Sequence, residues 1–307
     1  MSNSRSTLGA DGLLLLTAAI WGFAFVAQRS GMAVIGPFAY GAVRFALGAA
    51  SLVPLLLYVR RRRSRAYPRP PRAHRVAGAA LAGLVLFIAA SLQQVGLVYT
   101  TAANAGFITC LYVILVPIVG VALGKATGAR IWLGAVLALA GLYILSVGDG
   151  FTMARGDLLV LLGAVFWTVH ILLITWLVAR MDALEIALGQ FVTCAALSLV
   201  AALLVEPDLF AGVVPAAVPI LYGGLLSIGV AYTLQVVAQK TAHPAHASII
   251  MSMEALFAGV GGVLLLGEPL TARLLAGGGL MLAGMLISQV GGRVAEASRD
   301  SGKGGVA

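Results

Sequence analysis

Charged residues are scarce in this sequence: only 10% of its 307 residues are Asp, Glu, Lys or Arg, whereas 61% are hydrophobic. Soluble globular domains carry about 25% charged residues, so this composition excludes an ordinary soluble protein. Cysteine is also rare, with only Cys110 and Cys194 in the chain. These two lie far apart and lack Cys-x-x-Cys or partner-histidine spacing, which argues against a disulfide framework and against a cysteine metal site.

Familiar catalytic motifs are missing as well. The sequence contains no Gly-x-Ser-x-Gly, no His-Glu-x-x-His and no phosphate-binding glycine loop followed by lysine. It therefore gives no support to ATP-driven transport or to a common hydrolase mechanism. His243 and His246 have a spacing that fits a metal, but no third ligand lies nearby in the sequence. We expect a helix-capping or solvated turn there, with no metal and no other cofactor.

Uncharged apolar segments, by contrast, recur along nearly the whole chain. A helix needs about 20 such residues to cross the hydrocarbon core of a bilayer. The pattern predicts an all-α polytopic membrane protein of ten transmembrane helices, with no room for a separate soluble domain. The approximate spans are 11–30, 38–58, 76–98, 102–123, 130–147, 157–178, 183–204, 215–238, 245–266 and 271–292.

The basic residues are unevenly distributed. Eight of the 20 lie in the segment 60-RRRRSRAYPRPPRAHR-75, which the positive-inside rule places in the cytoplasm. Alternating the other connections from there puts sixteen basic residues inside and three outside, with Arg44 within a span. We therefore expect cytoplasmic tails at 1–10 and 293–307, in a bacterial inner (plasma) membrane. Because the topology rule accounts for the arginines, they indicate no nucleic-acid partner.

The chain also repeats itself internally. At offsets of 142 to 146 residues, Trp21 aligns with Trp167 and Tyr112 aligns with Glu254. Each half holds five predicted helices, and this odd number makes the second copy enter the membrane from the opposite side. Such an inverted repeat favours a cavity near the midplane that opens alternately to the two sides, as in secondary transporters. The two copies are expected at 11–147 and 157–292.

A single carboxylate interrupts the predicted span 245–266. Glu254 lies about ten residues into that span, near the bilayer centre, so it should face the bundle or a wet cavity. Three interpretations stay open. Glu254 is a structural group that braces its helix, a binding site for a substrate amine, or a carboxylate that couples transport to protons.

Aromatic and polar residues on single faces of other predicted helices supply further candidates. Such groups around a mostly apolar cavity would suit an amphipathic organic solute. Arg44, whose repeat partner is the uncharged Gln190, is interpreted as structural and is expected to reach toward the outer face. The candidates for substrate binding or coupling are Glu254, Trp21, Gln28, Gln94, Tyr112, Trp167, His170, Tyr232 and Gln235.

Three segments carry a resemblance to a known family. They are 20-IWGFAFVAQ-28, 93-QQVGLVYTTAANAGFITCLYVILVP-117, and the region from 253-MEALFAG-259 to 266-LGEPL-270. Residues 11–292 resemble the EamA-type transporters of the drug/metabolite transporter superfamily. The resemblance implies inverted five-helix repeats around a central cavity and export of small metabolites, such as amino acids and related amphipathic solutes, or drugs. Members of the family often read Glu-Pro in the ninth helix, where this chain has Glu254-Ala255.

Two other classes of protein are compatible with the same helices: an intramembrane enzyme that uses Glu254 and His170, and a membrane receptor or scaffold. Catalysis requires those two side chains within hydrogen-bond reach, transport requires a cavity between the repeats, and a scaffold requires neither. For a transporter, the expected partners are a small-molecule substrate, the lipid bilayer and, if Glu254 couples transport, protons. The sequence gives no oligomeric state.

Overall fold

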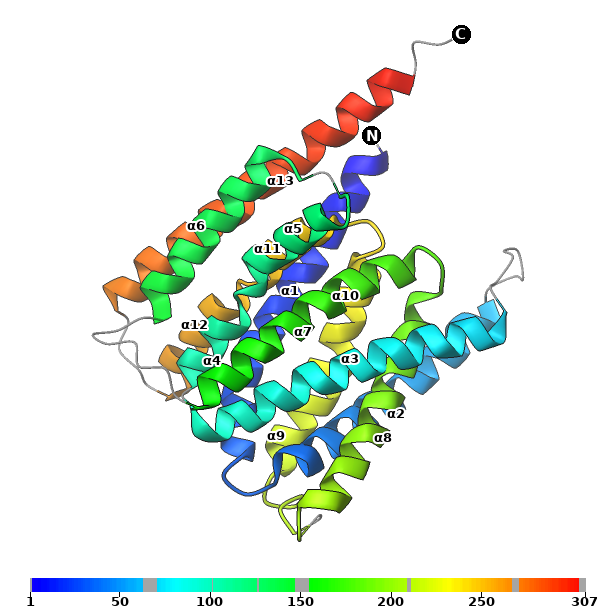
Figure 1. Ribbon diagram of the computed structural model, residues 1–307, viewed down its shortest axis with the longest axis vertical. Helices are drawn as coiled ribbons and strands as arrows, with labels where there is room; N and C mark the ends of the chain where they lie inside the picture. The colour runs from blue at the N-terminus through cyan, green and yellow to red at the C-terminus, as the bar shows by residue number, and fades with distance from the viewer. Residues whose placement is uncertain are drawn as a thin grey trace.

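Helices form all the regular structure in the part of the chain that the computed structural model describes (Figure 1). That part comprises the backbone of residues 2–62, 71–100, 102–125, 127–146, 155–208, 211–266 and 271–303. The all-helical architecture agrees with the apolar segments of the sequence. The centre of the arginine-rich segment (63–70), most of the 266–270 motif and the last four residues of the predicted C-terminal tail lie outside the described residues.

The helices follow the order of the two predicted repeats. The first half contains α1 (Ser2–Gly31), α2 (Pro37–Arg62), α3 (Arg72–Tyr99), α4 (Ala102–Thr109), α5 (Tyr112–Ala122) and α6 (Ala129–Ser146). The second half contains α7 (Arg155–Val178), α8 (Ala183–Val205), α9 (Ala217–Leu221), the π-helix η1 (Tyr222–Tyr232), α10 (Thr233–Ala238), α11 (Pro244–Met251), α12 (Glu254–Leu266) and α13 (Ala272–Lys303). The helices α1 and α13 continue into the predicted tails.

Seven helical segments in the described chain are long and apolar enough to cross a membrane. They correspond to seven of the predicted spans. The predicted spans 102–123, 130–147 and 271–292 contain shorter apolar helices, Tyr112–Ala122, Ala129–Ile144 and Leu275–Ser288. A polytopic membrane protein is therefore supported, whereas the number of ten spans stays a prediction.

Two predicted spans are broken in the middle. The helix α4 ends at Thr109 and α5 begins at Tyr112, and in the other half α11 ends at Met251 and α12 begins at Glu254. Both breaks fall at the same place in the repeat, because each pair of residues differs by the offset of 142. The chain stays helical through both breaks, because i→i+3 hydrogen bonds such as Val113 N to the Cys110 oxygen and Met253 N to the Ile250 oxygen bridge them. A short stretch of such tighter helix in the middle of a longer one often marks a functional hinge. The sequence pattern alone predicted continuous helices here.

The predicted span 215–238 is irregular in a different way, because its central part, η1, is a π-helix. π-helical turns are rare in proteins, and those that do occur are often found at functional sites. Two side chains of α1 bond to carbonyl groups of this segment: Trp21 Nε1 donates to the Ser227 oxygen at 3.2 Å, and Thr17 Oγ1 donates to the Ala231 oxygen at 3.2 Å. The first helix of the chain is thereby tied to the irregular helix of the second half.

The packing of the halves follows the repeat. The helix α1 contacts α11, α12 and the α9–η1–α10 segment, while its counterpart α7 contacts α4, α5 and α3. The helices α2 and α8 pack on each other, and so do α6 and α13, which lie side by side at one flank in Figure 1. Glycines bring α6 and α13 together, since a Cβ atom on Gly141 would lie 2.5 Å from the Gly277 oxygen. Backbones that approach this closely are typical of helix contacts in lipid.

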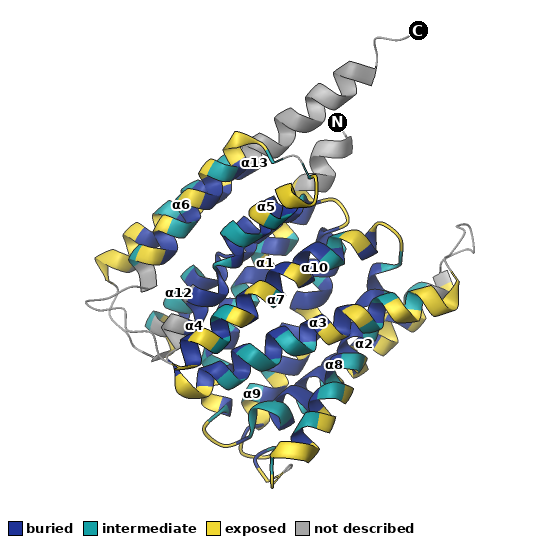
Figure 2. Ribbon diagram, in the orientation of Figure 1, coloured by how far each residue is buried: buried dark blue, intermediate teal, exposed yellow. Residues whose placement is uncertain are grey.

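The outer surface of the bundle is apolar, as expected for contact with lipid. Exposed residues are concentrated on the outward faces of the helices (Figure 2), and they include Leu204 and Val218, each 78% exposed. Exposed apolar surface of this extent marks an interaction site, here the bilayer. Many polar residues lie inside instead, among them Gln28, Gln93, Gln235 and Glu254.

Candidate functional site

A small cavity lies between the two halves, enclosed by residues of α1, α2, α3, α7, η1, α10 and the two broken helices. Its volume is about 40 Å³, which is room for roughly three water molecules. Both polar and apolar side chains reach it. The lining residues are Trp21, Phe25, Gln28, Arg44, Gln93, Thr109, Tyr112, Trp167, Ile171, Ser227, Tyr232, Gln235, Met251 and Glu254.

The cavity collects most of the candidates that the sequence suggested. Seven of the nine line it: Trp21, Gln28, Tyr112, Trp167, Tyr232, Gln235 and Glu254. The other two, Gln94 and His170, are buried but do not belong to the lining. Sequence reasoning did not select Gln93, Thr109 or Ser227, and it interpreted Arg44 as structural; all four line the cavity.

Glu254 joins the two broken helices at the cavity. Its carboxylate, on a residue that is 4% exposed, accepts a hydrogen bond from the Tyr112 hydroxyl at 3.0 Å and contacts Cys110 Sγ at 3.4 Å. Glu254 is the first residue of α12 and Tyr112 the first residue of α5, so equivalent positions of the two repeats touch. The arrangement combines a structural contact with an acid that borders the cavity.

Aromatic rings from both halves form one wall. Tyr232 lies between the two tryptophans, with ring centres 4.6 Å from Trp21 and 6.1 Å from Trp167. The rings of Phe45 and Phe191 stand behind it at 6.3 and 6.1 Å. Rigid rings of this kind offer a large apolar surface to a ligand.

Gln93 organises the polar wall. Its Oε1 accepts a hydrogen bond from Trp167 Nε1 at 2.9 Å and a longer one from Thr109 Oγ1 at 3.4 Å, and its Nε2 donates to Gln28 Oε1 at 3.4 Å. The signal for Gln93 was present in the sequence, because it aligns with Gln235 in the internal repeat. A stripe of polar residues on the same helix pointed to the adjacent Gln94 instead.

His170 supports the aromatic wall from behind. Its Nε2 pairs with Gln190 Oε1 at 2.9 Å, and its ring stands edge-on to Trp167 with centres 5.9 Å apart. In the described chain, no hydrogen bond connects His170 with Glu254. The contact that an intramembrane enzyme using these two residues would require is therefore not formed in this structure.

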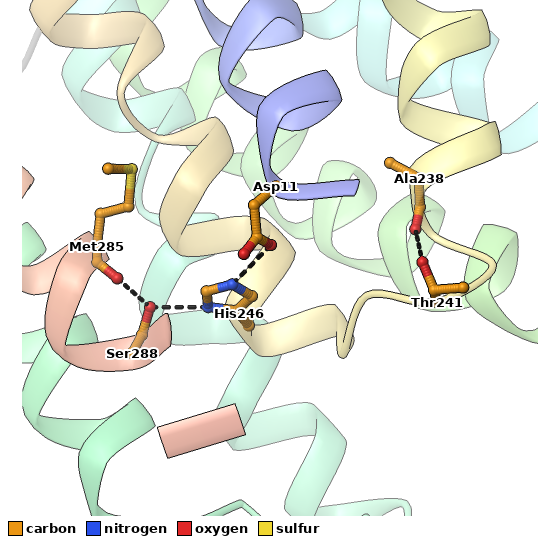
Figure 3. A network of polar contacts seen from close by, with 6 residues as sticks. All are labelled: Asp11, Ala238, Thr241, His246, Met285 and Ser288. Carbon is orange, nitrogen blue, oxygen red and sulfur yellow. Dashed lines mark hydrogen bonds and ion pairs between the residues drawn. The ribbon is translucent and has the colours of Figure 1, made fainter. Parts of the chain in front are cut away.

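A second polar cluster lies near the start of α1 (Figure 3). His246 Nε2 pairs with Asp11 Oδ1 at 2.9 Å, and its Nδ1 pairs with Ser288 Oγ at 2.8 Å. These buried groups tie α1, α11 and α13 together at one end of the bundle. His246 is thus part of a hydrogen-bond network with Asp11 and Ser288, while His243 precedes the first residue of α11.

A helical membrane bundle with an internal repeat and a polar cavity lined from both halves is typical of a membrane transport protein. The EamA-like transporter family matches the chain twice, at residues 8–147 and 154–289, and the chain belongs to this family. A relative from Archaeoglobus fulgidus, described as an uncharacterized transporter, is 30% identical over 91% of this chain and 85% of its own length. A second uncharacterized transporter from that organism is 28% identical over 59% of this chain and 61% of its own.

Solved structures support the fold. A crystal structure of a protein that is 20% identical in sequence superposes with a TM-score of 0.74, covering 95% of this chain and 99% of that chain. At this level of identity, the likeness concerns the arrangement of the helices alone. It agrees with the described helices and their two-part packing.

Proposed function

We propose that the protein is a secondary transporter that exports small organic solutes by alternating access through the central cavity. The solutes are amino acids, related amphipathic metabolites or drugs. The observation that carries the proposal is the meeting of two broken helices, at equivalent repeat positions, through Tyr112 and Glu254 on the cavity wall. Both helices tighten into i→i+3 turns at these positions, and short turns of this kind within a helix often act as hinges.

In this proposal the two halves form an inverted repeat. Helix α2 packs on its repeat counterpart α8, and α6 packs on its counterpart α13. These contacts support an inverted repeat, since a two-fold axis brings equivalent helices together. Rocking of one half against the other would then open the cavity to each side in turn. The proposed orientation has both termini and the arginine-rich segment in the cytoplasm of a bacterial cell.

Glu254 is proposed as the group on which substrate and protons act. It is the one acidic residue of the lining, and its partners in the described chain are Tyr112 and Cys110, neither of which is a cation. The buried carboxylate thus has no positive counter-charge in contact with it, and binding a proton or a substrate amine would neutralise it. The aromatic wall and the amides of Gln28, Gln93 and Gln235 would hold the rest of the solute.

The test is solute movement in proteoliposomes. Purified protein is reconstituted, the vesicles are loaded with a panel of amino acids, organic acids and amines, and efflux is followed with and without an imposed pH gradient. The proposal predicts saturable efflux of at least one class of solute. If vesicles with protein release every solute of the panel at the rate of protein-free vesicles, the transport proposal fails.

A further inference from the structure

Arg44 is buried on the wall of the same cavity and has no acidic partner there. The residue is 5% exposed and lines the cavity together with Glu254. Within the described residues, no carboxylate forms an ion pair with Arg44, whereas Arg75, for example, pairs with Glu185. Its Nε atom is buried without a hydrogen-bond partner. A buried guanidinium in this state is costly.

Neighbouring side chains stabilise the charge only in part. The Arg44 guanidinium carbon lies 4.9 Å from the ring centre of Tyr40 and 5.1 Å from that of Phe45. Ring faces attract a cation, but each such contact is worth far less than an ion pair with bidentate hydrogen bonds. The methylene groups pack against η1, where a Cβ atom on Gly223 would lie 3.5 Å from Arg44 Cδ. This packing fixes the stem of the side chain and leaves the charged end beside the cavity.

The cavity is electrically asymmetric. Its positive charge comes from Arg44 in the first half, whose repeat partner Gln190 is neutral and pairs with His170. Its acidic residue, Glu254, comes from the second half, and its repeat partner is Tyr112. Glu254 binds Tyr112 and Cys110 rather than Arg44. The cation is therefore available to a ligand even while the acid keeps its protein contacts.

We infer that Arg44 binds a carboxylate of the transported solute, and that the protein selects carboxylate-bearing solutes with an apolar body. This inference rests on the proposed transport function and names the substrate class of that site. A guanidinium matches the geometry of a carboxylate through two parallel N–H bonds. The aromatic wall of Trp21, Trp167 and Tyr232 would contact the apolar part, and the unpartnered Gln235 Oε1 would accept a hydrogen bond from a donor on the solute.

Three probes of one shape test the inference: 3-phenylpropionate, its neutral amide, and 3-phenylpropylamine. Their affinities are measured by calorimetry on the purified full-length protein. Wild type should bind the carboxylate best, and Arg44→Gln should weaken that binding by about 10- to 100-fold while changing the binding of the amide and the amine little. Arg44→Lys, which keeps the charge but loses the planar fork, should fall in between.

Arg29→Gln is the matched control, because it removes the same charge from an arginine outside the cavity lining. It should bind 3-phenylpropionate like wild type. The inference is overturned if wild type fails to bind 3-phenylpropionate, if it binds all three probes equally, or if Arg44→Gln binds 3-phenylpropionate as well as wild type does. Misfolding of Arg44→Gln would show as loss of amide and amine binding. In that case Arg44→Lys provides the test: the inference requires it to bind 3-phenylpropionate more weakly than wild type, and wild-type affinity would overturn the inference.

The transport assay separates this inference from the proposed function. If vesicles export neutral or cationic solutes, and Arg44→Gln exports them at the wild-type rate, transport stands and the carboxylate inference falls. If wild type binds 3-phenylpropionate through Arg44 but moves no solute across the vesicle membrane, the binding site stands and the transport proposal falls.

Discussion

Glu254 and Tyr112 occupy the same position in the two repeats but differ in chemistry, and their hydrogen bond of 3.0 Å crosses between the halves. That contact is compatible with all three interpretations of the glutamate, which differ in whether they need its charge. As a brace, Glu254 needs only an oxygen that accepts the Tyr112 hydrogen bond. As a coupling or binding group, it needs its charge, because only an ionisable carboxylate can exchange a proton or bind an amine. The two roles respond differently to an isosteric amide.

Glu254→Gln is expected to fold but to lose coupled transport. The amide oxygen can still accept from the Tyr112 hydroxyl, so the loss in free energy of unfolding should stay at about 1 kcal/mol or below. Glu254→Ala should lower the folded yield, since it leaves the buried hydroxyl without an acceptor. Folded protein is measured by size-exclusion chromatography after detergent extraction, and transport by efflux. Normal coupled transport by Glu254→Gln would leave only the bracing role.

Gln93 and Gln94 form a natural pair for testing burial of amides. The Gln93 amide oxygen accepts the Trp167 Nε1 hydrogen bond, whereas both amide atoms of Gln94 are buried without a partner in the described chain. Gln93→Leu should therefore cost about 1–3 kcal/mol in the free energy of unfolding. Gln94→Leu should be neutral or stabilising. Thermal unfolding of the two variants measures this, and equal effects would refute the assigned hydrogen bonds.

Where chemistry is unusual for a membrane, the sequence pointed to residues that line the cavity, and their role stays a prediction. Glu254, Trp21 and Trp167 were identified because a mid-span acid and paired tryptophans are rare there and recur in the repeat. Gln93 was missed because the sequence does not show whether Gln93 or the adjacent Gln94 faces the cavity. Only the packing of the helix decides between them. Arg44 was interpreted as structural because its repeat partner, Gln190, is uncharged and because its long side chain could reach toward the membrane surface. Its burial is a tertiary property.

At the scale of elements, helices were predictable and their interruptions were not. Length and hydropathy predicted most of α1, α2, α3, α7 and α8, each of which extends beyond its predicted span at one or both ends. The breaks at 110–111 and 252–253 contain no proline, and neither hydropathy nor composition distinguishes them from continuous helix. The π-helical turns of η1 were not predicted either, and carbonyl groups of η1 accept hydrogen bonds from side chains of the distant α1. Local sequence patterns do not show which distant residues a helix will contact.

Glycine contacts between α6 and α13 can be tested with a single methyl group. A Cβ atom on Gly141 would lie 2.5 Å from the Gly277 oxygen and 2.9 Å from the Met281 nitrogen, both rigid backbone atoms. Gly141→Ala should therefore destabilise the protein by about 1–3 kcal/mol, the usual cost of overpacking. Gly279→Ala on α13 is the control, because nothing lies within 4 Å of its Cβ position. Thermal unfolding should separate the two variants; if it does not, the close approach is absent.

At the scale of the whole molecule, the start of α1 and the end of α13 lie at the same end of the bundle in Figure 1. This agrees with the predicted even number of crossings. The charge bias of the connections predicts that this end is cytoplasmic. In sequence, family and fold the chain is a two-repeat EamA-like transporter, and its orientation and the inversion of the repeats are open to direct measurement.

The predicted orientation places the arginine-rich segment in the cytoplasm. A cysteine introduced by Ser64→Cys, in a variant with Cys110→Ser and Cys194→Ala, should resist an impermeant thiol reagent added to intact cells. The same cysteine should react in inside-out vesicles. Labelling in intact cells would reverse the orientation and with it the direction of every proposed step.

Alternating access is the central claim, and the accessibility of Ser227→Cys tests it most directly. Ser227 belongs to the π-helix η1 and lines the cavity. The test does not require the solute to be known. In the same Cys110→Ser, Cys194→Ala background, a small impermeant thiol reagent should label this cysteine both from outside intact cells and from the cytoplasmic face of inside-out vesicles. Ser30→Cys, at the exposed end of α1, is the control that should react from one side only. Labelling of Ser227→Cys from a single side, or from neither, would contradict a cavity that opens to both faces of the membrane.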